Sequence, residues 1–529
     1  MPLRPALVSY LVAAPAIASA KSLSSKAPAP RFTDPDRVAK LARAIPVIVS
    51  LMSAFAQRAR VPGIAYGVII DGKVVHIGTD GLRDIGANAP VDTNTVFRIA
   101  SMTKSFTALS ILRLRDEGRL SLDDPAERYV PELKSLKYPT TDSPKLTIRL
   151  LLSHSTGFPE DNPWGDQQLA DSDEQFSQML RRGVPFSTSP GTNYEYSNLG
   201  FAILGRIVTN VSGMPYTRYV RQNVLLPLGM TSTTLEVAQV PANRLAHGYR
   251  LQDGQWLEEP QLANGSFGSM GGMLTSVSDL GTWVAYLLDA WPPRDGNERG
   301  PVKRSSRREM QQVWRFSGAS AVMDTVTNTV TLSAGGYGYG LGVSRTCLFP
   351  SLVSHSGGLP GFGSIMRWLP DYGVGIVALG NLTYTGWGGV TSQALDALAR
   401  TGGLEQRTPQ PAPVLLTRRD QVVRLVTHWN DALADSIAAM NLYKDESKPR
   451  RRADIERLVT AAGGDCHNEG PFIAENALRG RWRMRCATGD IGIGITLAPT
   501  EPATVQYLEV RPLRRDASIA AQPACRITS

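Results

Sequence analysis

The sequence predicts an α+β protein, with an antiparallel sheet flanked by helices, an all-helical domain and a small C-terminal α+β module. Segments with strand character lie at both ends of about the first 400 residues, and the residues between them are mainly helical. A single sheet built from the two ends of a domain, with helices inserted between them, produces this order. A proline-rich stretch, TPQPAP at 408–413, then precedes a separate run of helical and strand patterns.

The elements of the larger domain follow in order along the chain. A helix is predicted at about 35–58, and the segment GIAYGVIIDGKVVHIG after it predicts a hairpin, because Asp71 and Gly72 separate two β-rich runs. A helical pattern begins at Ser101 and ends near Glu117. Further helices are predicted at 148–153, 173–181, 198–212, 215–224 and 278–290. Strands are predicted at 339–344, 352–355, 364–369 and 373–378.

The domain boundaries follow from these patterns. We predict a signal peptide, a linker with a helix start, a large domain, a second linker and a helix-then-sheet module, at 1–20, 21–45, 46–403, 404–416 and 417–529. The module has helical patterns at about 418–440 and 450–462, followed by alternating runs. It carries no recognisable catalytic set, so a partner-binding role and a role as a lid over the site are both open. No sequence motif predicts the structure or the function of residues 291–330.

The amino terminus predicts export. An arginine precedes a short apolar run from Ala6 to Ile17, which is followed by Ala-Ser-Ala, the order typical of a cleaved secretory signal; a leader without that function is the alternative. No other stretch reaches about 18 uninterrupted apolar residues, so no integral membrane segment is expected. We therefore predict a periplasmic or extracellular protein. In that setting Cys466 and Cys486 are predicted to form a disulfide, with unpaired thiols as the alternative.

Composition and charge exclude several classes of function. The net charge is +9, but no zinc-finger spacing, RNA-binding signature or basic-region heptad accompanies it, so no nucleic-acid partner is expected. The histidines show no H-E-x-x-H or clustered spacing, which predicts no metal site and no cofactor. A G-x-S-x-G elbow is also absent from the sequence. A small molecule or a peptide is the expected binding partner.

The first chemical motif is SMTK, in which Ser101 precedes Lys104 by three residues at the head of a helix. Residues three apart share a helix face, so the amine lies within reach of the hydroxyl. An amine that loses its proton through desolvation can activate that hydroxyl, and the helix start favours a developing oxyanion. Because this spacing arises about once or twice by chance in such a chain, a helix cap beside a solvated lysine is the alternative.

Two further motifs lie downstream. Tyr196 and Asn198 form Y-x-N at a helix start, where a phenol can exchange a proton and an amide can orient neighbouring groups. Tyr194 lacks an Asn two residues later. His355 opens HSGG at the end of a strand, where glycines allow a close approach of substrate. The alternatives are a packed ring with a helix cap for the first motif and an exposed turn for the second.

The order S-x-x-K, Y-x-N, H-x-G resembles that of the penicillin-recognising serine hydrolases. This family comprises class C β-lactamases, D-alanyl-D-alanine carboxypeptidases, D-aminopeptidases and related esterases. The sequence around the motifs is similar to that family as well, in the segments LLSHSTGFP, VSGMPYTRYVRQNVLLPLGMTST, GSMGGMLTSVSDLGTW and YGYGLGVS. The resemblance covers about 46–403 and implies a β-lactamase/transpeptidase-like fold with its site between the sheet and the helical domain. His154 resembles a structural histidine of the family.

The resemblance also implies roles for the motif residues. Ser101 corresponds to the acylated nucleophile, Lys104 to its activating neighbour, and Tyr196 to the base that later serves as leaving-group acid. Asn198 corresponds to an orienting amide.

The third motif corresponds to the substrate-orienting strand, formed here by His355, Ser356 and Gly357, and the backbone N–H groups of Ser101 and Gly358 correspond to the oxyanion hole. Class C β-lactamases have Lys-Thr-Gly where this chain has His-Ser-Gly, and a neutral histidine helps a substrate carboxylate less than an ammonium does.

These features predict a serine hydrolase that forms an acyl-enzyme on Ser101 and hydrolyses an amide, a D-amino-acid peptide or an ester. Because of His355, an esterase or D-peptidase is favoured over an efficient β-lactamase. One alternative is a penicillin-binding or ligand-sensing module that becomes acylated without turnover, and a true β-lactamase is another. The sequence indicates no oligomeric state.

Overall fold

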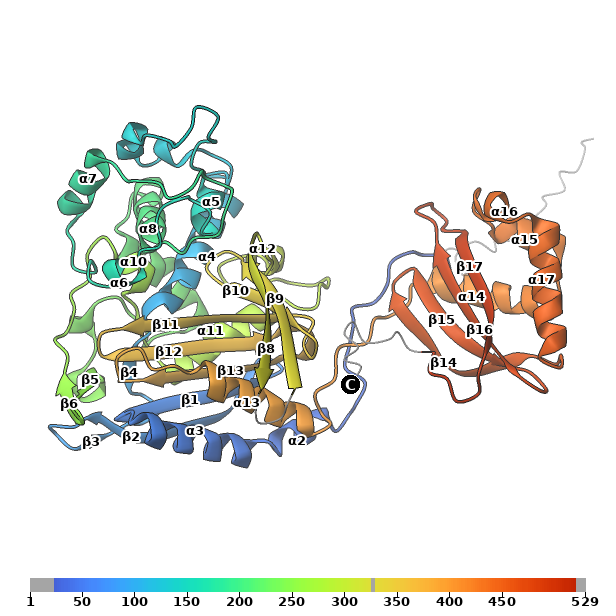
Figure 1. The fold of residues 1–529 in the computed structure, drawn as a ribbon, viewed down its shortest axis with the longest axis horizontal. Helices are drawn as coiled ribbons and strands as arrows, with labels where there is room; N and C mark the ends of the chain where they lie inside the picture. The colour runs from blue at the N-terminus through green and yellow to red at the C-terminus, as the bar shows by residue number, and fades with distance from the viewer. Residues whose placement is uncertain (1–22, 325–328, 520–529) are drawn as a thin grey trace, which may run out of the picture. The chain divides into compact units, whose positions relative to one another are not determined.

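The computed structural model describes residues 23–324 and 329–519, so the predicted signal peptide lies outside the described residues. The chain divides into two compact units (Figure 1). The large unit is formed by Asp34–Gln406. The C-terminal unit combines the described residues that precede the large unit with the described residues that follow it.

The large unit is built on an antiparallel sheet with the strand order β3-β2-β1-β13-β12-β11-β10-β9-β8. The register of the central pair places Ile64 opposite Gly380. Strands from the two ends of the unit are therefore neighbours, which confirms the prediction of one sheet built from both ends. The strands are β1 (Gly63–Ile70), β2 (Lys73–Asp84), β3 (Ala89–Pro90), β8 (Arg315–Asp324), β9 (Thr329–Tyr337), β10 (Gly342–Thr346), β11 (Leu352–Leu359), β12 (Phe362–Leu369) and β13 (Val374–Gly380).

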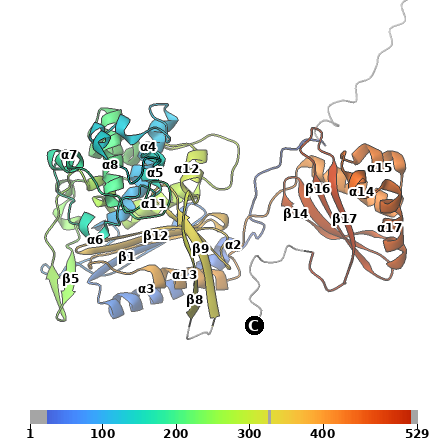
Figure 2. The same cartoon turned by 45° about the horizontal axis from the view of Figure 1, so that its top comes forward.

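Helices cover both faces of this sheet (Figures 1 and 2). Three of them, α2 (Arg37–Ala42), α3 (Ile45–Ala59) and α13 (Gly388–Arg400), lie over one face. Their inner residues form a core with the strands, as Ile48 and Leu395 do. The stretch Arg37–Ala59 is the one helical segment of the described chain that is long and apolar enough to cross a membrane, judged by length and composition alone.

The opposite face is covered by α11 (Val277–Leu288) and by the helical part of the unit, whose central helix is α4 (Thr103–Asp116). Helix α4 is buried nearly all round, including polar residues such as Thr107 and Ser110, so it lies at the centre of the larger core. The other helices here are α5 (Ile148–Leu152), α6 (Asn162–Gly165), α7 (Asp173–Arg182), α8 (Asn198–Ser212), α9 (Tyr216–Val220) and α10 (Gly268–Gly271). Two small sheets pair β4 (Val96–Arg98) with β7 (Leu274–Ser276) and β5 (Tyr249–Gln252) with β6 (Gln255–Glu258).

The segment without a sequence motif, 291–330, contains α12 (Arg304–Met310), strand β8 and the start of β9. Its strands were not predicted. Strand β8 is the outer strand of the sheet, and apolar Phe316 and polar Ser317 are both exposed on it. The alternation of apolar and polar residues that marks a half-buried strand is therefore missing.

The C-terminal unit packs helices on one face of a four-stranded antiparallel sheet. The predicted single helix at 418–440 is instead two helices, because Asn430 begins the second by accepting a hydrogen bond from the Leu433 N–H at 2.8 Å. The elements are α14 (Pro413–Thr427), α15 (Asp431–Ile437), α16 (Leu442–Asp445), α17 (Lys448–Ala461), β14 (His467–Asn476), β15 (Arg479–Arg485), β16 (Asp490–Leu497) and β17 (Val505–Leu513).

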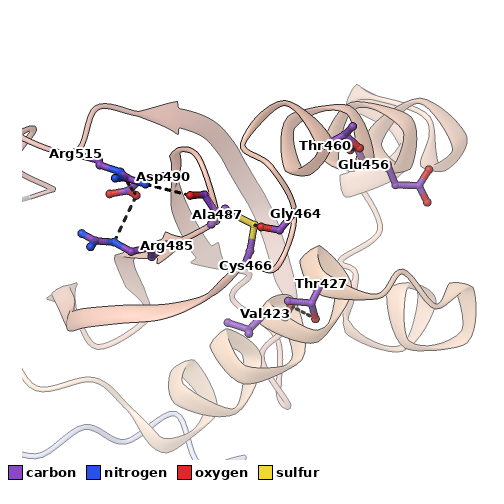
Figure 3. Close-up of a disulfide and its surroundings, with 11 residues drawn as sticks. Val423, Thr427, Glu456, Thr460, Gly464, Cys466, Arg485, Ala487, Asp490 and Arg515 are labelled. Atoms are coloured by element: carbon purple, nitrogen blue, oxygen red, sulfur yellow. Dashed lines mark hydrogen bonds and ion pairs between the residues drawn. A yellow bond between two sulfur atoms is a disulfide. The ribbon is translucent and has the colours of Figure 1, made fainter.

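A disulfide joins Cys466 to Cys486 in this unit. Figure 3 shows Cys466 beside Gly464, at the turn between the last helix and the sheet. Cys347, in the large unit, is disulfide-bonded as well. Unpaired thiols, the alternative weighed from the sequence, do not describe these three cysteines.

Candidate active site

Ser101 lies in a 3-10 turn, Ala100–Met102, that leads directly into α4. Ala100 adopts a left-handed conformation with φ of 47°, which is costly for a residue other than glycine and is typical of functional sites. One turn later, the Lys104 Nζ donates a hydrogen bond to Ser101 Oγ over 3.0 Å. The helix start thus brings the two residues of the first motif together.

The Lys104 ammonium is enclosed by neutral oxygen atoms. Its side chain is fully buried, and Nζ also donates to Asn198 Oδ1 at 2.6 Å and to the Met270 carbonyl at 2.9 Å. Burial lowers the pKa of Lys104 to about 7, although the negative charges of Asp166 and Asp161 oppose the shift. Near neutral pH this lysine is therefore present in both its charged and its neutral forms.

Tyr196 lies against the same pair of residues. The Lys104 Nζ is 4.8 Å from the centre of the Tyr196 ring. Burial raises the pKa of Tyr196 well above its ordinary value, and a hydrogen bond with Ser101 offsets only part of that rise. The phenol is therefore protonated near neutral pH. Tyr194 also lines the cavity, and burial raises its pKa to about 12.

His355 uses both of its ring nitrogens within the protein. Nδ1 lies 2.6 Å from the Ser356 carbonyl oxygen, to which it donates, and Nε2 lies 2.7 Å from the Tyr337 hydroxyl. Burial lowers the pKa of His355 to about 3, and the nearby charge of Lys104 adds to the effect. The ring is therefore neutral and offers a substrate neither a charge nor a free nitrogen in this arrangement.

The rest of the third motif forms a strand edge beside the nucleophile. A Cβ atom at Gly357 would lie 2.1 Å from the Ile99 carbonyl oxygen, and one at Gly358 would lie 2.5 Å from the Tyr384 ring. Only glycine fits at Gly357, because the strand packs directly against the backbone of the segment that carries Ser101, and at Gly358 a side chain would collide with the Tyr384 ring. Ser356 is exposed in the cavity. The oxyanion role of the Ser101 and Gly358 N–H groups stays a prediction.

Two carboxylates that the motifs did not predict support the site. Asp161 accepts hydrogen bonds from the backbone N–H groups of Asn198 at 2.6 Å and Leu199 at 2.8 Å, and so fixes the start of α8. Asp166 is 2% exposed and accepts a hydrogen bond from the Tyr384 hydroxyl at 2.9 Å. Burial raises the pKa of Asp166 to about 6.

His154 lies behind the catalytic motifs and not in the cavity. Its side chain is fully buried, its Nδ1 accepts the Ser197 N–H at 3.0 Å, and its ring centre is 4.3 Å from that of Tyr196. Burial keeps its pKa well below the ordinary value. These contacts fit the structural role that the resemblance implies for this residue.

A cavity of about 550 Å³ joins all three motifs, and it is lined by Ser101, Tyr196, His355 and Gly358 among others. Lys104 and Asn198 lie behind its wall. No group of three or more His, Cys, Asp or Glu side chains in 23–324 and 329–519 is arranged to hold a metal ion. The chemistry that this arrangement offers is nucleophilic attack by a serine beside a lysine of low pKa.

The sheet, the helical part and the cluster of Ser101, Lys104 and Tyr196 between them define the fold class of β-lactamases and penicillin-binding proteins. The chain belongs to the β-lactamase family, because the family model described as Beta-lactamase matches residues 48–401. This membership supports a serine hydrolase type of enzyme, and it confirms the resemblance drawn from the motifs.

Similar proteins agree with this membership. The chain is 29% identical over 332 residues to Protein flp of Staphylococcus aureus (strain COL), which covers 62% of this chain and 61% of that protein. It is 25% identical over 329 residues to Penicillin-binding protein 4* of Bacillus subtilis (strain 168), covering 59% of this chain and 66% of that protein. The matched region thus spans less than two thirds of either relative.

A solved structure shares the fold over most of the chain. It is that of the octameric penicillin-binding protein homologue from Pyrococcus abyssi, with a TM-score of 0.56 and 22% sequence identity, covering 90% of this chain and 91% of that one.

Proposed function

We propose that the protein is a serine hydrolase that forms an acyl-enzyme on Ser101 and hydrolyses an amide, a D-amino-acid peptide or an ester. The observation that carries this proposal is the fully buried Lys104, whose Nζ is 3.0 Å from Ser101 Oγ and whose pKa is lowered to about 7. A neutral amine at that position can accept the hydroxyl proton. Family membership supports the same chemistry.

In the first step, Ser101 Oγ attacks the carbonyl carbon while its proton passes to Lys104. The leaving group then receives a proton from the Tyr196 hydroxyl, and the Lys104 ammonium passes the proton it took from Ser101 to the tyrosinate, so both side chains return to their starting forms. These assignments follow from the two pKa directions, which favour Lys104 over Tyr196 as the base. They differ from the role that the resemblance implied for Tyr196. In the second step water attacks the acyl carbon and gives a proton to Lys104; the bond between that carbon and Ser101 Oγ breaks, Oγ takes the proton back, and the acid is released.

The neutral, fully hydrogen-bonded His355 supports an esterase or D-peptidase over an efficient β-lactamase. A β-lactam carries a carboxylate, and this ring adds no positive charge to hold it. We also propose that the protein is exported, with a cleaved signal at 1–20. The Cys466–Cys486 disulfide supports export, because disulfides persist in oxidising compartments.

The test compares the wild type with Ser101→Ala on p-nitrophenyl esters, D-alanyl amides and a chromogenic cephalosporin. Ser50→Ala is the matched control, because Ser50 is exposed on α3 and bonds only to its own helix, at the Pro46 carbonyl. We expect turnover in the wild type and control, and its loss in Ser101→Ala.

Intact-mass spectrometry separates the remaining outcomes. A stable adduct on Ser101 without multiple turnover would favour the penicillin-binding alternative over hydrolysis. Full hydrolysis by Ser101→Ala would overturn the proposal altogether.

A further inference from the structure

Tyr384 connects two walls of the active-site cavity. It lines the cavity from the segment between β13 and α13, on the side of the sheet. Its hydroxyl donates a hydrogen bond at 2.9 Å to Oδ2 of Asp166, which directly follows α6 in the helical part. Asn162, at the start of α6, lines the cavity as well. A single tyrosine thus joins the sheet to the helical part within the cavity that contains Ser101.

The ring of Tyr384 stands over the strand of the third motif. A Cβ atom at Gly358 would lie 2.5 Å from Cδ1 of this ring, whereas one at Gly357 would lie 2.1 Å from the Ile99 carbonyl oxygen. Alternate positions of a strand face the same side, so the ring is on the side of β11 from which Ser356 is exposed in the cavity. Tyr384 is 51% exposed despite these contacts. The ring is therefore a wall of the cavity that a ligand can touch.

The backbone around Tyr384 keeps the ring in place. Tyr384 has a φ of 52°, a left-handed conformation that is costly for a residue other than glycine and persists only where neighbouring contacts impose it. Its N–H donates to the Phe362 carbonyl at 3.1 Å, and the Thr383 N–H donates to the Tyr249 carbonyl at 2.8 Å. On the other side, the buried indole of Trp387 donates to a carbonyl of β12 at 3.0 Å. These contacts hold the ring without help from its hydroxyl.

We propose that the ring of Tyr384 selects the acyl group of the substrate and favours a short acyl chain over a long one. The inference rests on the proposed function and narrows its substrates to those with a small acyl part. The resemblance assigns the N–H of Gly358 to the oxyanion hole, and the carbonyl that such an N–H holds belongs to the acyl part. The acyl substituent is thus the part of the substrate nearest to the ring.

The leaving group lies on another side of the reacting carbon. In the proposed reaction it takes its proton from Tyr196, whose ring lies beside Lys104 in the helical part. A wall over Gly358 therefore restricts the acyl part and leaves the leaving group free to vary. A long acyl chain could enter only by displacing the ring from the contacts that hold it, which is unfavourable in a packed site.

The first test uses three esters with one leaving group, p-nitrophenyl acetate, butyrate and hexanoate. We expect the kcat/KM of the wild type to be about tenfold lower, or less still, for the hexanoate than for the acetate, because the ring obstructs the longer chain. Tyr384→Ala should raise kcat/KM for the hexanoate by about tenfold and change it for the acetate by less than about threefold. Equal losses on all three esters would mean a structural role and would overturn the proposal. So would a wild type whose kcat/KM does not fall with chain length.

Tyr384→Phe separates the ring from its hydroxyl. It removes the hydrogen bond to Asp166 and keeps the ring, so the preference for short chains should stay within about threefold of the wild type. A preference lost as fully as in Tyr384→Ala would overturn the assignment to the ring. Tyr507→Ala is the matched control, because Tyr507 is 55% exposed on β17 of the C-terminal unit, and it should change no rate by more than about twofold.

A binding measurement separates this inference from the proposed function. The p-nitroanilides of acetic and hexanoic acid are titrated calorimetrically into Ser101→Ala, which needs no turnover. We expect Tyr384→Ala in the same background to bind the hexanoyl compound about tenfold more tightly and the acetyl compound equally well. Equal binding of the hexanoyl compound with and without the ring would overturn the wall even if hydrolysis by Ser101 is established.

Discussion

Each of the two units buries a charged side chain, one among neutral hydrogen-bond partners and the other among opposite charges. In the large unit, the direct hydrogen-bond partners of Lys104 are all neutral, namely Ser101, Asn198 and Met270. In the C-terminal unit, the fully buried carboxylate of Asp490 forms ion pairs with three arginines, which are Arg483, Arg485 and Arg515. Figure 3 shows Asp490 between two of these arginines.

The difference shows what each charge is for. A buried charge among neutral partners is destabilised in its charged form, so it gives up its proton easily, which suits a base. A buried charge surrounded by opposite charges keeps its form and holds strands together. The large unit thus retains an unfavourable charge where chemistry needs it, and the C-terminal unit neutralises its own.

The largest expected effect comes from removing the amine in the large unit. Lys104→Met should lower kcat/KM by about 10³-fold, because Ser101 loses the group that accepts its proton. Steady-state hydrolysis of the preferred ester measures it. Lys448→Met is the control: Lys448 is partly exposed in the C-terminal unit and pairs with Asp435 at 2.9 Å. If both variants lose activity equally, the comparison between the units fails.

The second prediction concerns the carboxylate in the C-terminal unit. Asp490→Asn leaves three arginines beside a neutral amide. It should lower the free energy of unfolding of that unit by about 3 kcal/mol, without the fall in kcat/KM expected for Lys104→Met. Urea unfolding followed by circular dichroism measures it. Asp516→Asn, which removes an exposed partner of Arg514, should change stability by less than about 0.5 kcal/mol. Equal stability of the two variants would contradict a structural role for Asp490.

The parts of the site that the sequence predicted are those whose geometry is local. Ser101 and Lys104 meet because they lie three positions apart, where the 3-10 turn leads into α4. Tyr196 and Asn198 flank the start of another helix, and His355 and its glycines lie on one strand. The order of these short motifs along the chain was enough to relate them to one family, and the strand patterns at the two ends of the domain predicted the sheet built from both ends.

The residues that were missed act through distant contacts. Asp161 fixes the start of α8 from 37 positions away, and Asp166 meets Tyr384 across 218 positions. No spacing or period in a single sequence marks such pairs. The outer strands β8 and β9 were missed for another reason, since the exposed residues of β8 lack an apolar pattern.

The third prediction is that kcat/KM depends on pH through the titration of the Lys104 amine. Because burial lowers the pKa of Lys104 to about 7, its neutral form dominates above that pH and its ammonium below it. We expect kcat/KM to be level above pH 7 and to fall about tenfold per unit below it. His355→Gln should leave the midpoint unchanged, since the pKa of His355 is about 3 and its ring does not titrate in this range. A flat profile from pH 5 to 9 would contradict the assignment of Lys104 as base.

The smallest expected effect concerns how far a nearby negative charge stabilises the Lys104 ammonium. The negative charge of Asp166 raises the pKa of Lys104 against the effect of burial. It acts through space, because the hydrogen bonds of Lys104 go to Ser101, Asn198 and Met270. Asp166→Asn removes that charge, so the midpoint of the pH profile should move to lower pH by a fraction of one unit. The neutral amine would then persist at a lower pH, and activity at pH 6 should be retained better than in the wild type, provided that Tyr384 keeps its place.

Tyr384→Phe separates these two contributions. It removes the hydrogen bond to Asp166 and leaves the carboxylate in place. If the loss of that hydrogen bond lowers activity, Tyr384→Phe should show the lower activity, but its midpoint should move less than the midpoint of Asp166→Asn. Glu174→Gln, which removes an exposed carboxylate on α7, should leave the midpoint where it is. A midpoint that moves to higher pH in Asp166→Asn would contradict the prediction, and a midpoint that stays fixed would mean that the charge of Asp166 does not act on the amine. The contrast with Asp490 would then be sharper still.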